Sequence, residues 1–352
     1  MKKTLIALAA LAATGAFAQN VTISGTMDLT YRASSATSTA GAETKTTKIG
    51  KDGIGTTGFA LSGNEDLGGG LKAVFLYEHN FDPFDTGALA ASYTPTLTTT
   101  GTAAATVTTT QANGQMFVGL EGAFGSVKVG APNTPSLSVQ GIRGGSFGTK
   151  DGGRAALGAG GYTTMFGKAL TRFDSTVNYT SPNFSGFSFG VTYSPKTDNA
   201  ATPEQGALSD VGAFYNNGPL SVGVSVFSQD VGTVASTTAK EEQTSYAASW
   251  NFGFAKVGLG GHEYKKGTAK NSGLNAVADV PLSSALTLTA NIQQVNDKSA
   301  ANLDADQFAV GLQYALSKRT TAYVRYIDQS VDNLTTGTKD ADSFIVGLRH
   351  NF

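Results

Sequence analysis

Basic side chains gather in one segment of the sequence, between positions 131 and 172. Five of them stand there against a single acid: Arg143, Lys150, Arg154, Lys168 and Arg172 against Asp151. Clusters of Arg and Lys around a narrow passage attract anions and are typical of anion pores. For each single residue the alternative is an ordinary solvated charge. The segment is therefore a candidate selectivity element.

Covalent catalysis has little support in the sequence. The three histidines, at positions 79, 262 and 350, lie more than 80 residues apart, and there is no cysteine. H-E-x-x-H and G-x-S-x-G motifs are both missing, so standard zinc and serine-hydrolase arrangements have no basis. We expect no enzymatic activity, cofactor or metal. An outer-membrane enzyme whose catalytic residues are distant in sequence stays open as a less favoured alternative.

The composition narrows the class of protein. Of 352 residues, 40% are apolar and 14% are charged, against about 45–50% and 25% in soluble domains. No apolar run approaches the ~20 residues of a membrane helix. The net charge of −1 argues against a nucleic-acid partner, which usually meets a basic face.

The N-terminus predicts export. Lys2 and Lys3 precede an apolar run that ends in Ala16-Phe17-Ala18. A charged start, a short apolar centre and an A-x-A site are typical of a secretory signal peptide. We therefore expect residues 1–18 to be removed and residues 19–352 to form the mature domain.

Most of the remaining sequence alternates with a period of two. Val21, Ile23 and Leu29 alternate with Thr22, Ser24 and Thr30, and the same pattern recurs up to the last residue. This period predicts strands with one apolar and one polar face. No helix is expected beyond the signal peptide.

Short and long connections also alternate. Seven tight turns are predicted at 65–70, 122–125, 181–186, 216–219, 251–253, 281–285 and 316–319. Eight long loops are predicted at 34–55, 82–113, 131–172, 195–208, 229–243, 264–272, 296–305 and 328–341. Together they join sixteen strands. Short turns on one rim and long loops on the other are typical of an outer-membrane barrel.

A closed barrel in lipid explains both faces of these strands. In a dry core the polar groups of Thr, Ser, Asn and Gln would be costly to bury. In a barrel these side chains face the aqueous lumen, and the apolar face of each strand meets lipid. A soluble all-β lectin or adhesin is the weaker alternative. The inward register also places charged residues in the lumen: Arg32, Lys72, Lys128 and Arg349, with Asp28, Glu78 and Glu121.

Several segments resemble Gram-negative general porins of the Neisseria and Burkholderia type. The longest is GFALSGNEDLGGGLKA at 58–73, which resembles the family's G-F-x-x-x-G-x-E-D-L-G-x-G-L-K-A element. Other similar segments are FVGL at 117–120, FGSV at 124–127, NYTSPNFSGF at 178–187, LSKRT at 316–320 and GLRHNF at 347–352. They follow the family's order along the whole chain.

The resemblance implies a homotrimer of sixteen-stranded antiparallel transmembrane barrels, all-β, with the third outer loop (131–172) folded inward as a constriction. It also implies that the terminal Phe352 acts as a signal to the barrel-assembly machinery. One departure concerns charge. The family commonly has Arg after the Val-Gly that ends the fifth strand, and Ala131 stands here instead.

These observations predict a porin of the Gram-negative outer membrane, embedded in its lipid. It would be a water-filled passive diffusion channel for ions and small hydrophilic solutes, with a mild preference for anions. A substrate-specific channel, which would need an aromatic track along the lumen, stays open as the alternative within transport.

Overall fold

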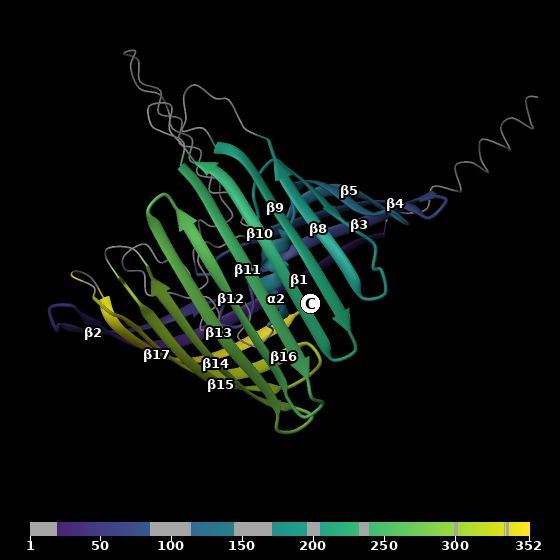
Figure 1. The fold of residues 1–352 in the computed structure, drawn as a ribbon. Helices are drawn as coiled ribbons and strands as arrows, with labels where there is room; N and C mark the ends of the chain where they lie inside the picture. The colour runs from purple at the N-terminus through teal and green to yellow at the C-terminus, as the bar shows by residue number, and fades with distance from the viewer. Residues whose placement is uncertain are drawn as a thin grey trace, which may run out of the picture.

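The chain folds into a closed antiparallel barrel (Figure 1). The computed structural model describes residues 20–84, 114–143, 171–195, 205–231, 239–298, 302–333, 335 and 338–352. The first strand, β1 (Asn20–Ser38), closes the sheet by pairing with the last, β17 (Thr338–Asn351), from Thr26–Asn351 to Ser38–Thr338. The predicted signal peptide, 1–18, lies outside the described residues.

From β3 onwards, each strand pairs with the next along the chain. The strands between β1 and β17 are β2 (Glu43–Lys51), β3 (Gly58–Gly68), β4 (Leu71–Asn80), β5 (Met116–Gly122), β6 (Gly125–Ala131), β7 (Thr176–Thr180), β8 (Phe187–Ser194), β9 (Gln205–Asn217), β10 (Leu220–Val231), β11 (Ala239–Asn251), β12 (Lys256–Lys266), β13 (Ala269–Pro281), β14 (Leu286–Asp297), β15 (Ala305–Ala315) and β16 (Thr320–Val331).

The seventeen strand segments occupy sixteen positions around the barrel. β2 and β3 follow one another along the same edge of β1: β2 pairs with Leu29–Thr37 and β3 with Asn20–Thr26. Residues 52–57 interrupt what would otherwise be one strand. The predicted sixteen-stranded antiparallel barrel is therefore confirmed.

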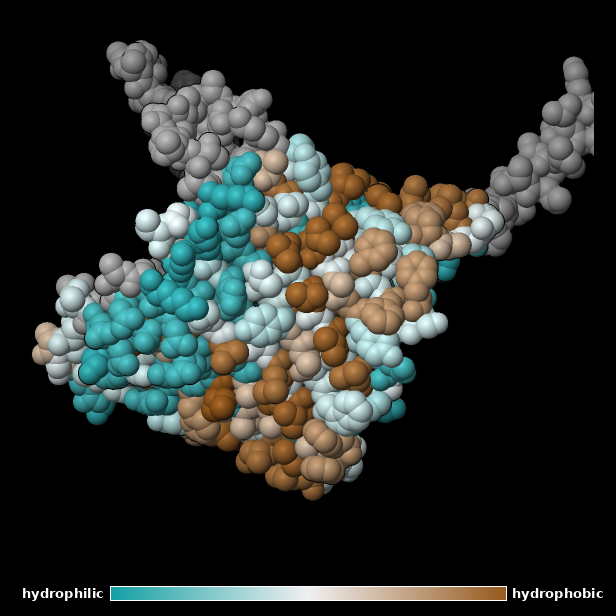
Figure 2. Space-filling view, in the orientation of Figure 1, coloured by the Kyte–Doolittle hydropathy of each residue, from teal (hydrophilic) through white to brown (hydrophobic). Residues whose placement is uncertain are grey.

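The two faces of the wall differ as the alternation predicts. On β8, Phe187, Phe189 and Tyr193 are exposed on the outer surface, whereas Gly190 and Thr192 are buried on the inner one. Figure 2 shows the outer apolar side chains as a band over the part of the wall nearer the short turns. Among the described residues, every strand except β2, which pairs with β1 alone, has two hydrogen-bonded neighbours, and this closure satisfies the backbone where the wall meets lipid.

All seven predicted tight turns join consecutive strands, but several predicted long loops are shorter than expected. β1 runs on to Ser38, and only Gly267 and Thr268 separate β12 from β13. The predictions 34–55 and 264–272 were therefore wrong in extent. The reason is physical: beyond the bilayer both faces of a strand meet water, so the apolar alternation that marks a strand in sequence is lost.

A short helix, α2 (Pro135–Ile142), overturns the prediction that the mature chain has no helix. Thr134 caps it by accepting a hydrogen bond from the Leu137 amide at 3.2 Å, and Pro135 occupies the first turn. Both features are established helix-start signals. Among the described residues, no helix is long and apolar enough to cross a membrane.

Candidate functional site in the barrel lumen

Helix α2 packs against the inner wall of β8–β11. Glycines on the inner faces of those strands make room for it. A Cβ added at Gly212 would lie 2.8 Å from Pro135, and one at Gly223 would lie 2.5 Å from Ile142. Side chains at these positions would push the helix toward the centre of the barrel. The inner-wall glycines therefore set how far α2 projects into the lumen.

A buried carboxylate holds the first turn of α2 to the wall. Asp210 on β9 accepts hydrogen bonds from the Ser136 amide at 2.9 Å and from the Ser136 hydroxyl at 2.7 Å. The same hydroxyl lies 3.0 Å from the hydroxyl of Ser225 on β10. Hydrogen bonds to a charged acceptor contribute about 1.5–3 kcal/mol each, so this contact fixes the helix firmly.

Arg143 ends the helix against the wall of β12. Its side chain is 5% exposed, and its Nε donates to the Gln140 carbonyl at 2.9 Å. A Cβ at Gly258 would lie only 1.6 Å from the Arg143 carbonyl oxygen. This backbone-to-backbone approach requires glycine. The guanidinium is thus sequestered beside the wall.

The opposite wall carries a second inward element. Residues 52–57, between β2 and β3, fold over Asp28, whose Oδ2 accepts from the Ile54 and Gly55 amides at 2.7 and 2.5 Å. The Tyr323 hydroxyl donates to Oδ1 of the same carboxylate. A Cβ at Gly53 would lie 1.9 Å from the Tyr323 hydroxyl. Asp28 is therefore a buried anchor for this segment.

Three arginines lie on the same inner wall as this anchor, on β1, β16 and β17. Arg32 and Arg325 flank the buried Ile345 in register, and Arg349 lies directly opposite Asp28. Arg325 is 1% exposed and donates from Nη1 to the Gly53 carbonyl at 2.8 Å. We call Arg32, Arg325 and Arg349 the arginine wall. It places three positive charges on the wall that holds this one carboxylate.

Glu78 and Arg172 are connected by a chain of hydrogen bonds that passes through Gln115 and Asn133. The Gln115 amide donates to Glu78 Oε2 at 2.7 Å, and Gln115 Oε1 accepts from the Asn133 amide at 3.0 Å. Arg172 Nη1 then donates to Asn133 Oδ1 at 3.0 Å. Burial lowers the pKa of Arg172, whereas the charge of Glu78 raises it. The acid therefore partly offsets this loop cation.

A cavity of about 730 Å³ lies between α2 and the inner wall formed by β1, β3, β4 and β17. Its polar lining comes from β1, β4, β17 and the ends of the helix-bearing loop. The helix contributes Leu137 and Gly141, and the surroundings contribute Thr26, Glu78, Gln115, Asn133, Arg172 and Asn351. The geometry can pass small polar solutes through a field set by nearby charges.

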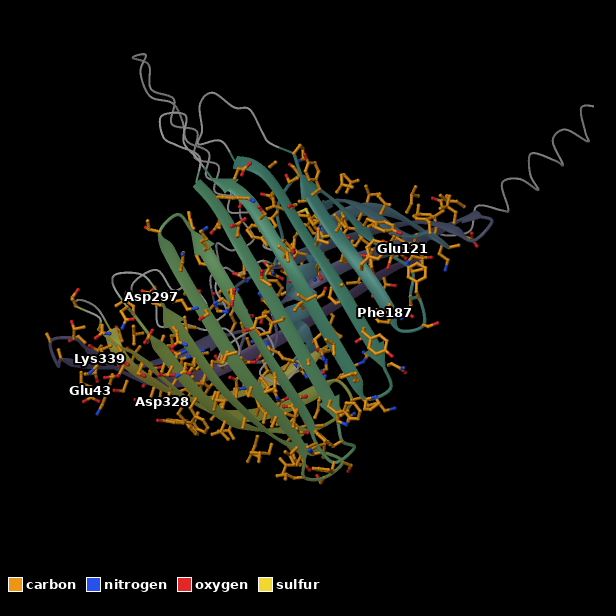
Figure 3. The ribbon with its side chains drawn as sticks, in the orientation of Figure 1. Glu43, Glu121, Phe187, Asp297, Asp328 and Lys339 are labelled. Atoms are coloured by element: carbon orange, nitrogen blue, oxygen red, sulfur yellow. The ribbon has the colours of Figure 1, made fainter. Side chains whose placement is uncertain are left out.

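The remaining inward charges lie near the short turns. Lys128 forms a 3.5 Å ion pair with Glu121, and its Nζ lies 4.8 Å from the centre of the Phe117 ring. Lys72 pairs in register with Glu121. Figure 3 shows Glu121 toward the end of the barrel opposite Asp297 and Lys339. These three residues form a mouth cluster, separate from α2 and the arginine wall.

Four predicted site residues, Lys150, Asp151, Arg154 and Lys168, lie outside the described residues. The other predicted lumen residues fall into three groups: Asp28 with Arg32 and Arg349, Glu78 with Arg172, and the mouth cluster; Arg143 stands apart beside β12. Sequence analysis missed Asp210, Tyr323 and Arg325. Their inward register was a usable signal. Asp210 and Arg325 lie next to the exposed Val211 and Tyr326, and Tyr323 lies between the partly exposed Ala322 and Val324.

Phe352 lies at the seam where the barrel closes. Its amide donates to the Gly25 carbonyl at 3.0 Å, and the Gly25 amide donates back to the Phe352 carbonyl at 3.0 Å. A Cβ at Gly25 would lie 2.3 Å from the phenyl ring. The terminal residue thus extends the β1–β17 pairing at this seam.

Comparison with known proteins agrees with this architecture. A model of Gram-negative porins matches residues 4–334. Outer membrane porin protein 32 of Delftia acidovorans is 30% identical over 343 residues, covering 92% of this chain and 88% of that protein. An anion-selective porin from Comamonas acidovorans has a similar structure, with a TM-score of 0.73 at 23% identity, covering 95% and 100% of the two chains. A trimer form of OmpT from Vibrio cholerae has a TM-score of 0.62 at 15% identity, covering 96% and 100%.

Proposed function

The chain belongs to the Gram-negative porin family and forms a passive diffusion channel in the outer membrane, and we propose that this channel prefers anions modestly. Porins are channels rather than enzymes, so the alternative of an outer-membrane enzyme is rejected. The arginine wall carries the proposal about charge, because its three cations share that wall with one carboxylate, Asp28, which already accepts structural hydrogen bonds.

The electrostatics favour a modest preference. Asp28 accepts three hydrogen bonds from residues 54, 55 and 323, so its charge offsets only part of the arginine wall. One ion near one charge at 4 Å interacts by about 1 kcal/mol in water and about 4 kcal/mol at an effective dielectric of 20. A tenfold permeability ratio needs about 1.4 kcal/mol. We therefore expect a few-fold preference for anions. The anion selectivity printed in the name of the Comamonas porin supports the same sign.

The test is a reversal potential across a planar bilayer with unequal KCl on the two sides. We expect the wild-type channel to give an anion-to-cation permeability ratio of about two to ten, which needs less than about 1.4 kcal/mol. The preference should grow in dilute salt, where screening is weaker. A cation-preferring wild type would contradict the proposal.

Segment 131–172 is assigned as the constriction loop. Support comes from its described part, because α2 rests on the inner wall through Ser136 and Asp210. Arg143 and Arg172 contribute to its charge, together with Lys150, Asp151, Arg154 and Lys168. Replacing Arg143, Arg154 and Arg172 together with Gln should move the reversal potential toward cations. The mouth cluster of Lys72, Glu121 and Lys128 should have little influence, because Lys128 and Glu121 already pair.

Residues 1–18 are assigned as the export signal and residues 19–352 as the mature barrel domain. The terminal Phe352 is assigned as the contact for the barrel-assembly machinery, because it is exposed at the closing seam. Deleting it should lower the amount of protein in the outer membrane far more than it changes single-channel conductance. Normal outer-membrane levels of the truncated protein would contradict this role.

The barrel is assigned to a homotrimer embedded in outer-membrane lipid. The trimer form of the similar OmpT supports this state. Exposed apolar residues on the short strands β5–β7, among them Val118, Val129 and Val177, offer a flat surface to a neighbour or to lipid. Unboiled gel electrophoresis should show a heat-modifiable band with three times the monomer mass. A monomer in native mass spectrometry would contradict the trimer.

A further inference from the structure

The residues between β2 and β3 outnumber those that lie opposite them on β1. β2 pairs with β1 as far as Leu29, and β3 pairs with β1 from Thr26. Between those points β1 has two residues, Met27 and Asp28, whereas the chain from 52 to 57 has six, which is four more. Extra residues in one strand of a pair interrupt the ladder and bend away from it. We call residues 52–57 the seam cover.

The seam cover reaches past β1 and β17 to β16. The Gly53 carbonyl accepts a hydrogen bond from Arg325 Nη1 on β16 at 2.8 Å. The buried side chain of Ile54 belongs to an apolar cluster with Tyr323 on β16 and Ile345 on β17. The segment is therefore held against the inner wall on both sides of the seam where the barrel closes.

The two ends of the seam cover meet over Asp28. Asp52 Oδ1 accepts from the Thr57 amide at 2.6 Å, and Asp52 has a φ of 64°, a left-handed conformation that Asp tolerates better than most residues. The Asp52 amide donates to the Asp28 carbonyl at 3.0 Å. Thr57 Oγ1 accepts from the Asp28 amide at 3.1 Å. The cover is thus fixed directly above this one residue of β1.

The seam cover buries Asp28 but leaves two arginines of the same wall partly open. Asp28 is 0% exposed, and its two carboxylate oxygens accept from two backbone amides of the cover and from the Tyr323 hydroxyl. Arg32 and Arg349 are both partly exposed. An ion in the lumen therefore meets these guanidinium groups directly, and it meets the carboxylate only through the cover.

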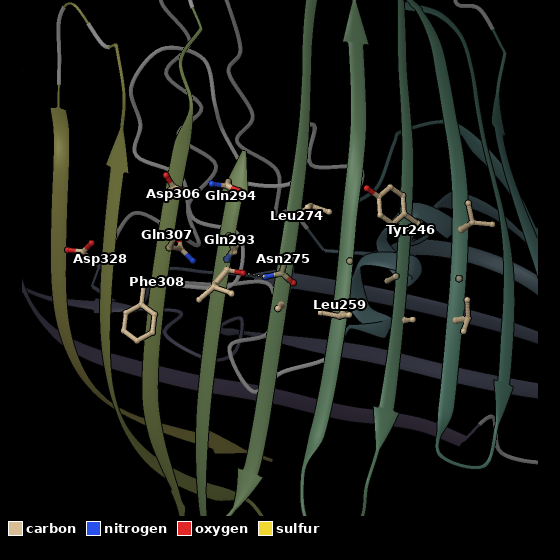
Figure 4. A pocket seen from close by; sticks show the side chains of 18 of the residues that line it. Tyr246, Leu259, Leu274, Asn275, Gln293, Gln294, Asp306, Gln307, Phe308 and Asp328 are labelled. Carbon is tan, nitrogen blue, oxygen red and sulfur yellow. Dashed lines mark hydrogen bonds between the residues drawn. The ribbon is translucent and has the colours of Figure 1, made fainter. Parts of the chain in front are cut away.

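The inner wall of β13–β15 is neutral at the level shown in Figure 4. Asn275, Gln293 and Gln307 lie in direct register on these three strands. The labelled carboxylates in the same view, Asp306 and Asp328, are exposed on the outer face. There the acids are turned away from the lumen. At Asp28, whose side chain points inward, covering the group has the same effect.

We propose that the seam cover is a specificity-determining element, which withdraws the Asp28 carboxylate from the lumen and lets Arg32 and Arg349 set the charge that a permeating ion meets. The inference rests on the proposed function, because it concerns the anion preference of the same channel. Selectivity follows the charges that line the passage, so a covered carboxylate counts for less than an open guanidinium. Asp279 on β13, which interacts electrostatically with Arg325, is unchanged in every test below.

The main variant deletes residues 53–56 and replaces Asp52 with Asn. Two residues then remain opposite Met27 and Asp28, so the ladder can continue, and an even deletion keeps the inward and outward faces of β2 and β3. We expect Asp28 to open to the lumen and the anion-to-cation ratio to fall about threefold or more, equivalent to about 0.7 kcal/mol. Asp52→Asn removes a negative charge, so its own effect runs the opposite way. Reversal potentials in dilute KCl measure the ratio.

A second substitution separates the carboxylate from any change in pore width. Asp28→Asn removes the charge but keeps an oxygen for the amides of the cover. In the shortened channel it should raise the ratio about threefold or more, whereas in the full-length channel it should raise the ratio by less than about 1.5-fold. A wider pore alone would lower the ratio without this recovery. Equal factors in the two backgrounds would overturn the proposal.

Chemical labelling tests the seam cover without a current measurement and with its length unchanged. A water-soluble carbodiimide with glycinamide labels accessible carboxylates of the detergent-solubilised full chain, and peptide mass spectrometry locates the label. Glu263, exposed on β12, is the reference. Asp28 should become labelled in Gly53→Ala, whose Cβ would lie 1.9 Å from the Tyr323 hydroxyl, but neither in the wild type nor in Thr56→Ala, which alters only a cavity-lining side chain. Labelling of Asp28 as complete as that of Glu263 in the wild type would contradict the cover.

The anion preference and the seam cover can fail separately. A wild type that prefers cations, in which Asp28→Asn still acts mainly in the shortened channel, would contradict the preference and support the cover. A wild type that prefers anions, in which Asp28→Asn has equal effects in both backgrounds, would contradict only the cover.

Discussion

The two inner walls of the barrel position their inward elements by different means. On β8–β12, bare backbone accommodates α2: Gly212, Gly223 and Gly258 leave room, and Asp210 supplies one polar anchor. On β1, β16 and β17, long charged side chains surround residues 52–57, with Asp28 beneath them. We therefore propose that the first wall mainly sets the cross-section of the pore and that the second contributes mainly to its field. On this proposal, size and charge selectivity can be changed separately.

The largest expected effect comes from adding one methyl group to the helix-bearing wall. Gly258→Ala places a Cβ 1.6 Å from the Arg143 carbonyl oxygen, so the end of α2 must move toward the lumen. Overpacking of this kind costs about 1–3 kcal/mol. We expect single-channel conductance to fall by at least half, with the permeability ratio changed far less.

The matched control for that variant is Gly141→Ala, within α2 itself. A Cβ at Gly141 meets no atom within 4 Å, and alanine favours helix by about 0.5–1 kcal/mol. Its conductance should stay close to the wild type. Equal conductance of the two variants would show that the glycine wall does not place the helix.

The next effect concerns the anchor at the other end of α2. Asp210→Ala removes both acceptors of Ser136, which contribute about 1.5–3 kcal/mol each. We expect open-channel current noise to increase severalfold. The current noise of Asp210→Asn should lie between that of the wild type and that of Asp210→Ala, because the Asn side-chain oxygen still accepts from the Ser136 amide. Asp306→Ala, on the outer face of β15, serves as the control; noise as large in that variant would contradict the anchor.

The sequence predicted the barrel better than its interior, and the reason is local. A strand such as Phe187–Ser194 can be recognised from its own residues, because apolar side chains face lipid and polar or small ones face the lumen in alternation. The helix start at Thr134 and Pro135 was readable in principle, but a Gly- and Ser-rich loop offers little apolar periodicity. Contacts such as Ser136 with Asp210 join residues 74 positions apart, and only the closed sheet brings them together. The part of the constriction segment that lies outside the described residues, with Lys150, Arg154 and Lys168, stays a prediction.

Charge on the second wall should change selectivity with little change in conductance. Arg32→Gln with Arg349→Gln removes two cations from the arginine wall and leaves Arg325 on the Gly53 carbonyl. We expect the anion-to-cation ratio to fall about three- to tenfold, equivalent to about 0.7–1.4 kcal/mol. Reversal potentials in dilute KCl measure it, with Lys318→Gln as the control. An unchanged ratio would show that the arginine wall does not set the charge preference of the channel.

The smallest expected effect tests whether Glu78 weakens the basic field of the loop. Glu78→Gln removes the charge but keeps an oxygen to accept from the Gln115 amide, so the chain to Arg172 should persist. Because Glu78 offsets the charge of Arg172, its loss should raise the anion-to-cation ratio, by less than about twofold, or about 0.4 kcal/mol. Arg172→Gln alone should lower the ratio by a similar factor. The double variant should return close to the wild type if the two charges act mainly on each other and on the same ions. The measurement needs about 10 mM salt, where the screening length is about 30 Å. A ratio that falls in Glu78→Gln would mean that the carboxylate holds Arg172 in place rather than opposing its charge.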